Sequence, residues 1–191
     1  MAEPLPNTNT KPPGVILEEV KGVLVPEYLV HKKDAAMCAE PGDALLYNWT
    51  RSVFSFVIGI KTWHKISHCE MYVGDLKSIA SRDGIGVSQY DFKLDRLGYI
   101  LKPPPVFNFE KSYHWYETVK GQKYDWMGLL RFSWASEYDP LKGNNKMFCS
   151  EFLSRAYNKG DWYLFNNEDN DAIAPFMFLL APFVKIVKVV E

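Results

Sequence analysis

The sequence predicts an α+β domain, with strands concentrated in its first half and helices in its second half. Short apolar and aromatic runs alternate with turn signals over residues 44–90, as is typical of strands. The dipeptide Asp83-Gly84 lies between two of these runs and marks a β-hairpin. Apolar residues recur at helical spacing over 109–120 and again from Cys149. At 191 residues the chain is long enough for one domain with a substantial core.

The order of elements follows from these patterns and from the turns between them. A turn over residues 39–43 starts the first clear strand, and the run Lys102-Pro-Pro-Pro-Val106 interrupts the chain before the helical half. Ser52, Asp125 and Asp171 are candidate helix caps. We expect strands at 14–17, 22–25, 44–49, 67–73, 78–81, 85–90 and 184–190, and helices at 53–60, 109–120, from 124–125, from 149 and after 171.

The two ends of the chain carry no strong targeting signal. Residues 1–13 are polar and proline-rich and are expected to be a flexible segment, while 14–191 form a single domain. The N-terminal segment has no apolar stretch, so no secretory signal is expected. The longest apolar stretch, 173–190, contains two prolines and two lysines and makes a poor membrane span. The expected location is cytoplasmic or virion-associated.

Composition excludes several classes of partner and site. The net charge of −1 gives no electrostatic basis for binding nucleic acid or an anionic membrane. Cys38, Cys69 and Cys149 are odd in number and far apart, which argues against a disulfide framework and fits a reducing compartment. They form no Cys-x-x-Cys pair, so we expect neither a metal site nor a cofactor.

Cys149 is the strongest candidate for chemistry. It follows a polar loop and begins a helical pattern, with Ser150 and Glu151 in the first turn. The unpaired N–H groups and the macrodipole at a helix N-terminus favour a thiolate, which is the nucleophilic form of cysteine. The alternative is that Cys149 is buried and only packs, as many cysteines do.

A second candidate element is the strand around His68. Because side chains alternate along a strand, His68 and Glu70 face one way, and Cys69 and Met71 face the other. The second pair is apolar and should face the core. His68 is therefore available as a general base for Cys149, whereas His64 is a rival base in the preceding loop. His31 and His114 are expected to be surface or packing residues.

Four motifs occur in one order along the chain. They are Pro41-Gly42-Asp43 with 45–47, Ser67-His68 through Gly74-Asp75, Tyr124-Asp125-Trp126 with Gly128, and Phe148-Cys149-Ser150-Glu151. Together they resemble the circularly permuted NlpC-type hydrolases, papain-like proteins that include the YiiX-like enzymes and, more distantly, lecithin:retinol acyltransferase. The motifs span about 60% of the chain. The stretch 80–87 also resembles small phage-encoded relatives.

This resemblance implies a papain-like fold in which a small antiparallel sheet or open barrel packs against the nucleophile helix. It implies that Cys149 is the nucleophile and His68 is the base. The family takes its third residue from the next strand, about a dozen residues on, which points to Ala80 or Ser81. Ser81 is the polar residue of these two, and Glu70, which lies on the same face of its strand as His68, is the competing candidate for the residue that orients His68. Asp43, Asp125 and Glu151 are expected to be structural.

The resemblance leaves three functions open. The first is a cysteine hydrolase that cleaves an amide or peptide bond, with cell-wall peptide (peptidoglycan) as the first substrate to consider. The second is an acyl-lipid thioester hydrolase or acyltransferase, for which the aromatic segments 126–134 and 162–165 would line an acyl groove. The third is a non-catalytic structural module, for example of a virion.

Overall fold

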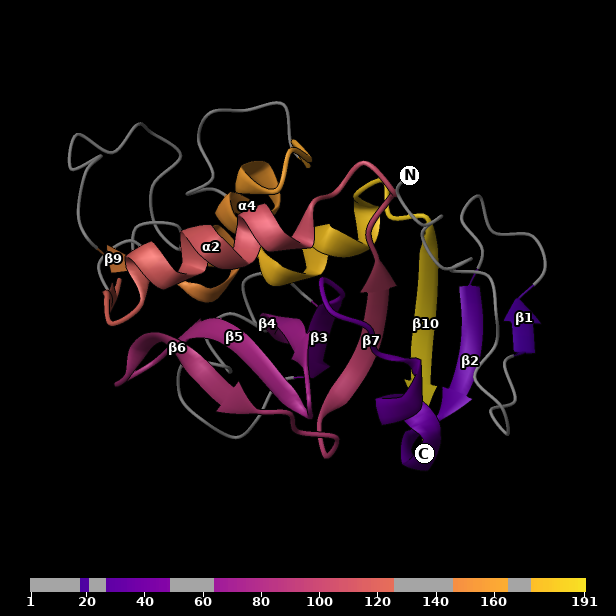
Figure 1. The fold of residues 1–191 in the computed structure, drawn as a ribbon. Helices are drawn as coiled ribbons and strands as arrows, with labels where there is room; N and C mark the ends of the chain where they lie inside the picture. The colour runs from indigo at the N-terminus through magenta and orange to yellow at the C-terminus, as the bar shows by residue number, and fades with distance from the viewer. Residues whose placement is uncertain (1–17, 21–26, 49–63, 126–145, 165–172) are drawn as a thin grey trace.

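The protein is built around one large open sheet, with helices α2 and α4 on one of its faces (Figure 1). The computed structural model describes residues 18–20, 27–48, 64–125, 146–164 and 173–191. In these ranges the sheet has eight strands in the order β1-β2-β10-β7-β3-β4-β5-β6. Its two outer strands, β1 and β6, are not neighbours, so the described sheet is not a closed barrel.

Most of the sheet is antiparallel. Every neighbouring pair runs antiparallel except β10 and β2, which run parallel. Strands β8 and β9 form a separate parallel pair just before the Cys149 helix. The strands are β1 Glu18–Val20, β2 Glu27–His31, β3 Ala44–Asn48, β4 Ile66–Gly74, β5 Lys77–Arg82, β6 Gly86–Asp91, β7 Leu97–Lys102, β8 Lys123–Tyr124, β9 Lys146–Met147 and β10 Lys185–Val190.

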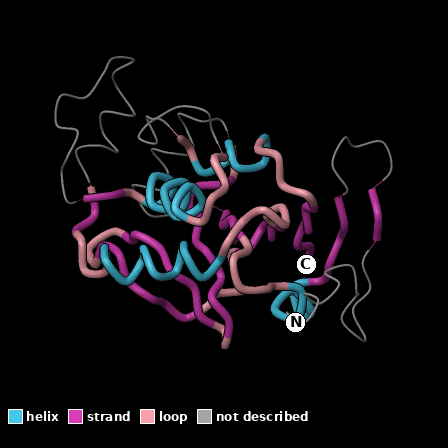
Figure 2. The backbone as a smooth tube through the Cα atoms, turned by 45° about the horizontal axis from the view of Figure 1, so that its top comes forward, coloured by secondary structure: helices cyan, strands magenta, loops and turns pink. Residues whose placement is uncertain are grey.

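Two α-helices cover one face of this sheet (Figures 1 and 2). Helix α2 spans Phe109–Val119. Asn108 is its N-cap, and the Asn108 side chain accepts a hydrogen bond from the Lys111 amide. Helix α4 spans Cys149–Lys159 and ends at Gly160. Two 3₁₀ helices, η1 (Lys32–Cys38) and η3 (Pro175–Leu180), complete the described helical elements.

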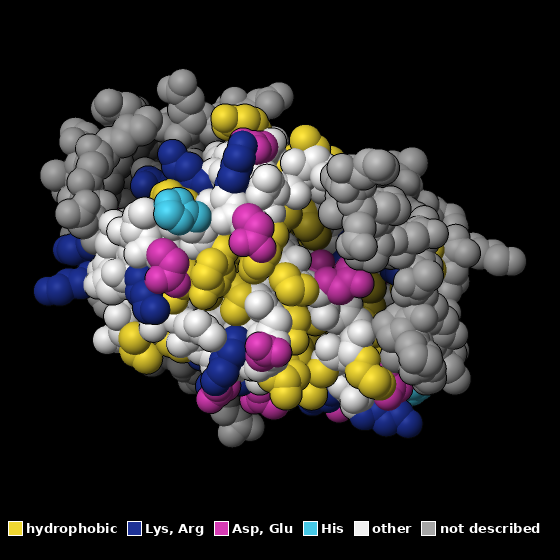
Figure 3. All heavy atoms as spheres, viewed as in Figure 1, with side chains coloured by type: hydrophobic (Ala, Val, Ile, Leu, Met, Phe, Trp, Pro, Cys, Tyr) yellow, Lys and Arg dark blue, Asp and Glu magenta, His cyan; other side chains and the backbone are white. Residues whose placement is uncertain are grey.

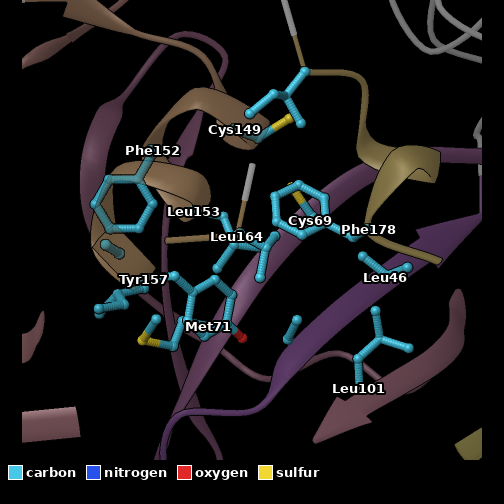
Figure 4. Close-up of a cluster of buried hydrophobic side chains, with 14 of the residues drawn as sticks. Leu46, Cys69, Met71, Leu101, Cys149, Phe152, Leu153, Tyr157, Leu164 and Phe178 are labelled. Carbon is cyan, nitrogen blue, oxygen red and sulfur yellow. The ribbon is translucent and has the colours of Figure 1, made fainter. Parts of the chain in front are cut away.

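The sheet separates two apolar cores because its side chains alternate between its faces. Ala44, Leu46, Cys69 and Met71 belong to the core that α2, α4 and η3 cover. Part of this core is drawn in Figure 4. Leu45, Tyr47, Tyr72 and Ile100 belong to the smaller core on the other face, with η1. Buried side chains on both faces explain why β3 is almost continuously apolar.

The predicted α+β class and the antiparallel character of the sheet are confirmed. Strands β3, β4, β5, β6 and β10 and helices α2 and α4 lie where the sequence predicts them. The prediction that Ile85 begins the second strand of the hairpin is wrong. Residue 85 belongs to the hairpin loop, and β6 begins at Gly86. The expected strands at 14–17 and 22–25, the helix at 53–60 and the Asp171 cap lie outside the described residues.

Several described elements differ from expectation, since strands β1, β2 and β9 and the 3₁₀ helix η1 were not predicted. Strand β7, which runs through the centre of the sheet between β10 and β3, was not predicted. Residue 124 is the last residue of the short strand β8. The rest of the helix expected from 124–125 lies outside the described residues. On the face drawn in Figure 3, basic and acidic side chains are interspersed, in line with the net charge of −1.

Candidate active site

Helix α4 begins at Cys149, as the sequence predicts. Phe148, the preceding residue, is extended, and its side chain caps none of the backbone N–H groups of the first turn. Phe152, Leu153 and Ala156 are buried in the core under the sheet, which fixes the helix against β4 and β5. The Ser150 hydroxyl donates to the Ile173 carbonyl at 2.5 Å and so ties the helix start to the segment before η3.

His68 and Glu70 project from β4 away from the core residues Cys69 and Met71, as predicted. His68 is the register partner of Tyr47 on β3, and their rings are 5.9 Å apart. The paired register of β4 with β5 runs from Met71 to Gly74. His68 therefore lies outside the paired part of β4 and β5, and its ring contacts Glu70 of the same strand.

Glu70 is held by three side chains although it is fully buried. Its Oε1 accepts hydrogen bonds from His68 Nε2 at 2.8 Å and from Arg82 Nε at 2.6 Å. Arg82 Nη2 lies 2.5 Å from the same oxygen. The Ser78 hydroxyl donates to Oε2 at 2.5 Å. Burial alone would raise the pKa of Glu70, but the hydrogen bond and charge of His68, together with Arg82 and Ser78, lower it to about 2.

The His68 ring also interacts with Cys149. Its Nε2 is the nitrogen that faces Glu70. Burial would lower the pKa of His68, but the charge of Cys149, a hydrogen bond with it and the contact with Glu70 raise the pKa to about 9. His68 therefore holds a proton at neutral pH, between a sulfur and a carboxylate.

Cys149 lies next to a second thiol as well as to the imidazole. A hydrogen bond with the Cys69 side chain is the largest influence on Cys149, and with the charge of His68 it outweighs burial and lowers the pKa of Cys149 well below its ordinary value. Burial raises the pKa of Cys69, so this thiol keeps its proton and can donate it to the thiolate. Figure 4 shows both cysteines in the same cluster, with Phe178 beside Cys69.

Ser81, the other predicted orienter, lies elsewhere. It is on the core-facing side of β5, and its hydroxyl donates to the Met147 carbonyl at 2.5 Å. Met147 ends β9, two residues before Cys149. Ser81 therefore fastens the segment that leads into α4, and in the described structure the carboxylate that accepts from His68 is that of Glu70.

The remaining histidines are placed as expected. The His64 ring stacks on Phe176 at 5.3 Å, and its Nδ1 accepts a hydrogen bond from the Ile66 amide. That nitrogen is therefore occupied, and the residue lies against η3. His31 contacts the carbonyl of Glu191, and His114 is exposed on α2.

Asp43 and Glu151, two of the residues expected to be structural, have side-chain partners outside the Cys149–His68 pair. Asp43 Oδ2 accepts from the Glu40 amide at 2.7 Å, which confirms that it ties its turn, and from Lys102 Nζ at 2.6 Å. Glu151 forms an ion pair with Arg155 one turn along α4. The Asp125 amide donates to the Met147 carbonyl at 3.3 Å.

Sequence reasoning missed Arg82 and Ser78. Both lie on β5 with Ala80 between them, so the strand period of two places them on one face. That spacing, opposite a buried glutamate on the neighbouring strand, was the available signal. In the described ranges, no three His, Cys, Asp or Glu side chains are grouped as a metal site requires, and no helix is long and apolar enough to cross a membrane.

Comparison of the chain with models of known protein families gives no match, and comparison with curated proteins gives none either. The assignment of function therefore rests on the geometry of Cys149, His68 and Glu70.

Proposed function

We propose that this protein is a cysteine hydrolase with a papain-like arrangement, in which Cys149 is the nucleophile, His68 the general acid and base, and Glu70 the residue that orients His68. One observation carries this proposal: the His68 ring contacts the Glu70 carboxylate through Nε2, and the same ring interacts with Cys149. His68 and Glu70 come from a strand, and Cys149 comes from a helix start 81 residues after His68.

The first step is attack by the Cys149 thiolate on a carbonyl carbon. The interactions with Cys69 and His68 favour the thiolate, so the nucleophile exists before substrate binds. The oxygen of the carbonyl then carries negative charge. We assign the stabilisation of that oxyanion to N–H groups of the first turn of α4, which begins at Cys149.

The second step is proton transfer to the leaving group. The His68 imidazolium donates its proton to the departing amine, the C–N bond breaks, and an acyl-thioester remains on Cys149. Neutral His68 then removes a proton from water, which attacks the thioester and releases the acid. Glu70 accepts from Nε2 throughout, so the ring keeps its orientation.

The substrate class follows from the motif resemblance. The circularly permuted NlpC-type hydrolases that the four motifs resemble make cell-wall peptide the first substrate to test, and an amide bond the first bond. The same acyl-enzyme chemistry serves an acyl-lipid thioester, so a panel that contains both amide and acyl-lipid substrates separates the two classes.

The test compares wild type with Cys149→Ala, His68→Ala and the double variant on purified peptidoglycan, short peptide amides and acyl esters. We expect each single variant to lose all measurable turnover and the double variant to be no worse, because the two groups act as a unit. Cys38→Ala is the matched control, since burial raises the pKa of the Cys38 thiol. Unchanged hydrolysis in Cys149→Ala would refute the proposal, and absence of hydrolysis in wild type with an unreactive Cys149 would favour a non-catalytic module.

A further inference from the structure

Arg82 contacts the same carboxylate oxygen that holds His68. It is the last residue of β5, and its side chain is 19% exposed. Its Nε and Nη2 lie 2.6 and 2.5 Å from Glu70 Oε1, while His68 Nε2 lies 2.8 Å from that atom. The guanidinium carbon lies 3.9 Å from the centre of the Tyr90 ring on β6, which supports the group from its other side.

The charged groups around Glu70 alternate in sign. From α4 to β5 they are the Cys149 thiolate, the His68 imidazolium, the Glu70 carboxylate and the Arg82 guanidinium. The net charge of this chain of four groups is zero, which is the least costly way to bury them.

The other titratable groups that face Glu70 do not alter this balance. They are the phenols of Tyr47 on β3 and Tyr90 on β6, and burial raises the pKa of both. Both phenols are therefore neutral in the pH range in which His68 titrates. The remaining polar partner, Ser78, is uncharged.

A second cation on the same oxygen has a consequence that packing alone would not have. A buried carboxylate with His68 as its single cation would hold the imidazolium proton very tightly. Arg82 takes part of the charge of Glu70 and fixes its position by two contacts from one planar group. His68 then stays oriented yet can release its proton to a leaving group.

We propose that Arg82 is a positioning residue of the hydrolysis: it holds Glu70 from behind and shares its negative charge, so that His68 is oriented without being locked in the protonated form. This inference rests on the proposed function, because it assigns Arg82 a part in the same proton transfer.

The test is the pH dependence of Cys149 alkylation by iodoacetamide, which needs no substrate, followed by the pH profile of hydrolysis. Wild type should show two steps, formation of the ion pair at low pH and loss of the His68 proton at high pH. In Arg82→Gln, Glu70 keeps its charge but loses its second cation, so the upper step should move to higher pH by about one unit. Glu70→Gln should move it the opposite way.

Lys77→Gln is the matched control, since Lys77 is a cation of the same strand that pairs with the exposed Asp91. It should leave both steps in place. An upper step that stays in place or moves down in Arg82→Gln would overturn the role of Arg82. A wild type with no ion-pair step would instead overturn the proposed function itself, so the two failures are distinguishable.

Arg82→Lys separates charge from position and serves if Arg82→Gln does not fold. One amine keeps the charge but cannot reproduce the two contacts, so the upper step should stay within about 0.3 units while kcat falls several-fold at unchanged KM. Wild-type kcat in a folded Arg82→Lys enzyme would contradict the positioning role.

Discussion

Two buried carboxylates on neighbouring strands of this sheet behave in opposite ways. Glu70 on β4 and Asp43, the residue before β3, are 0% and 2% exposed, and each contacts a basic side chain. The contacts of Glu70 lower its pKa to about 2, whereas burial raises the pKa of Asp43 to about 6. Burial is therefore not what distinguishes a candidate catalytic carboxylate from a structural one.

The difference lies in the neighbours. Glu70 has two cations and a hydroxyl, and all of them favour its ionised form. Asp43 has one cation, Lys102, which it shares with the Glu40 carboxylate. Burial would lower the pKa of Lys102, but both carboxylates stabilise its charged form, so its pKa rises. Asp43 therefore forms a clamp between a turn and β7, while Glu70 belongs to a charge chain that ends at a thiol.

The largest expected contrast is in turnover. Glu70→Gln keeps the shape of the side chain but removes its charge, so His68 loses its orientation and turnover should fall on the order of a hundredfold or more. Asp43→Asn should leave turnover per folded molecule unchanged. Steady-state kinetics corrected for folded fraction by circular dichroism compares the two. Equal losses in both variants would mean that Glu70 is merely structural.

The second contrast is in the pH dependence of stability. The pKa of Glu70 is lowered on folding. Its ionised carboxylate therefore stabilises the folded state above pH 4.5, and this stabilisation is lost as pH falls towards 2. The pKa of Asp43 is raised on folding, so its ionisation costs stability as pH rises from 3.8 to 6. Each carboxylate changes the free energy of unfolding by about 3 kcal/mol over its pH range.

Urea unfolding of wild type, Glu70→Gln and Asp43→Asn at several pH values measures how each carboxylate changes the free energy of unfolding. With rising pH, wild type should gain stability relative to Glu70→Gln and lose it relative to Asp43→Asn. Slopes of the same sign would show that the two carboxylates do not differ as described.

The smallest contrast concerns the two serines of β5. Ser78→Ala removes the donor to Glu70 Oε2 and should cost about 1–2 kcal/mol of stability together with a several-fold loss of turnover. Ser81→Ala removes a donor to the Met147 carbonyl and should cost about 1 kcal/mol with turnover nearly unchanged. Thermal melts and steady-state kinetics of the two variants test these expectations. A larger loss of turnover in Ser81→Ala than in Ser78→Ala would make Ser81 the residue that orients His68.

Much of the fold was predictable because its signals are local. Alternation along β4, the turn at Asp83-Gly84 and the helical spacing after Cys149 each depend on a few neighbouring residues. Strand β7 was missed because it is buried on both faces and so lacks alternation, and because Gly98 interrupts it.

The site was predictable in part for the same reason. Periodicity places His68 and Glu70 on one face, which is enough to suggest that they meet. It cannot choose between Glu70 and Ser81, because that depends on which face of β5 turns towards β9. The contacts of Arg82 with Glu70 and of Cys69 with Cys149 arise from the pairing of distant segments, which no local pattern specifies.

We propose that His68 and Cys149 form an ion pair, and the rate of Cys149 alkylation against pH tests this pair most directly. All three thiols are buried, so exposure does not distinguish them and the ionisation state does. Mass spectrometry of iodoacetamide-treated wild type should show Cys149 labelled well below pH 7, ahead of Cys38 and Cys69. In His68→Ala its reactive step should move towards the ordinary thiol range of about 8.5. Identical profiles in wild type and His68→Ala, or earlier labelling of Cys38, would contradict the account.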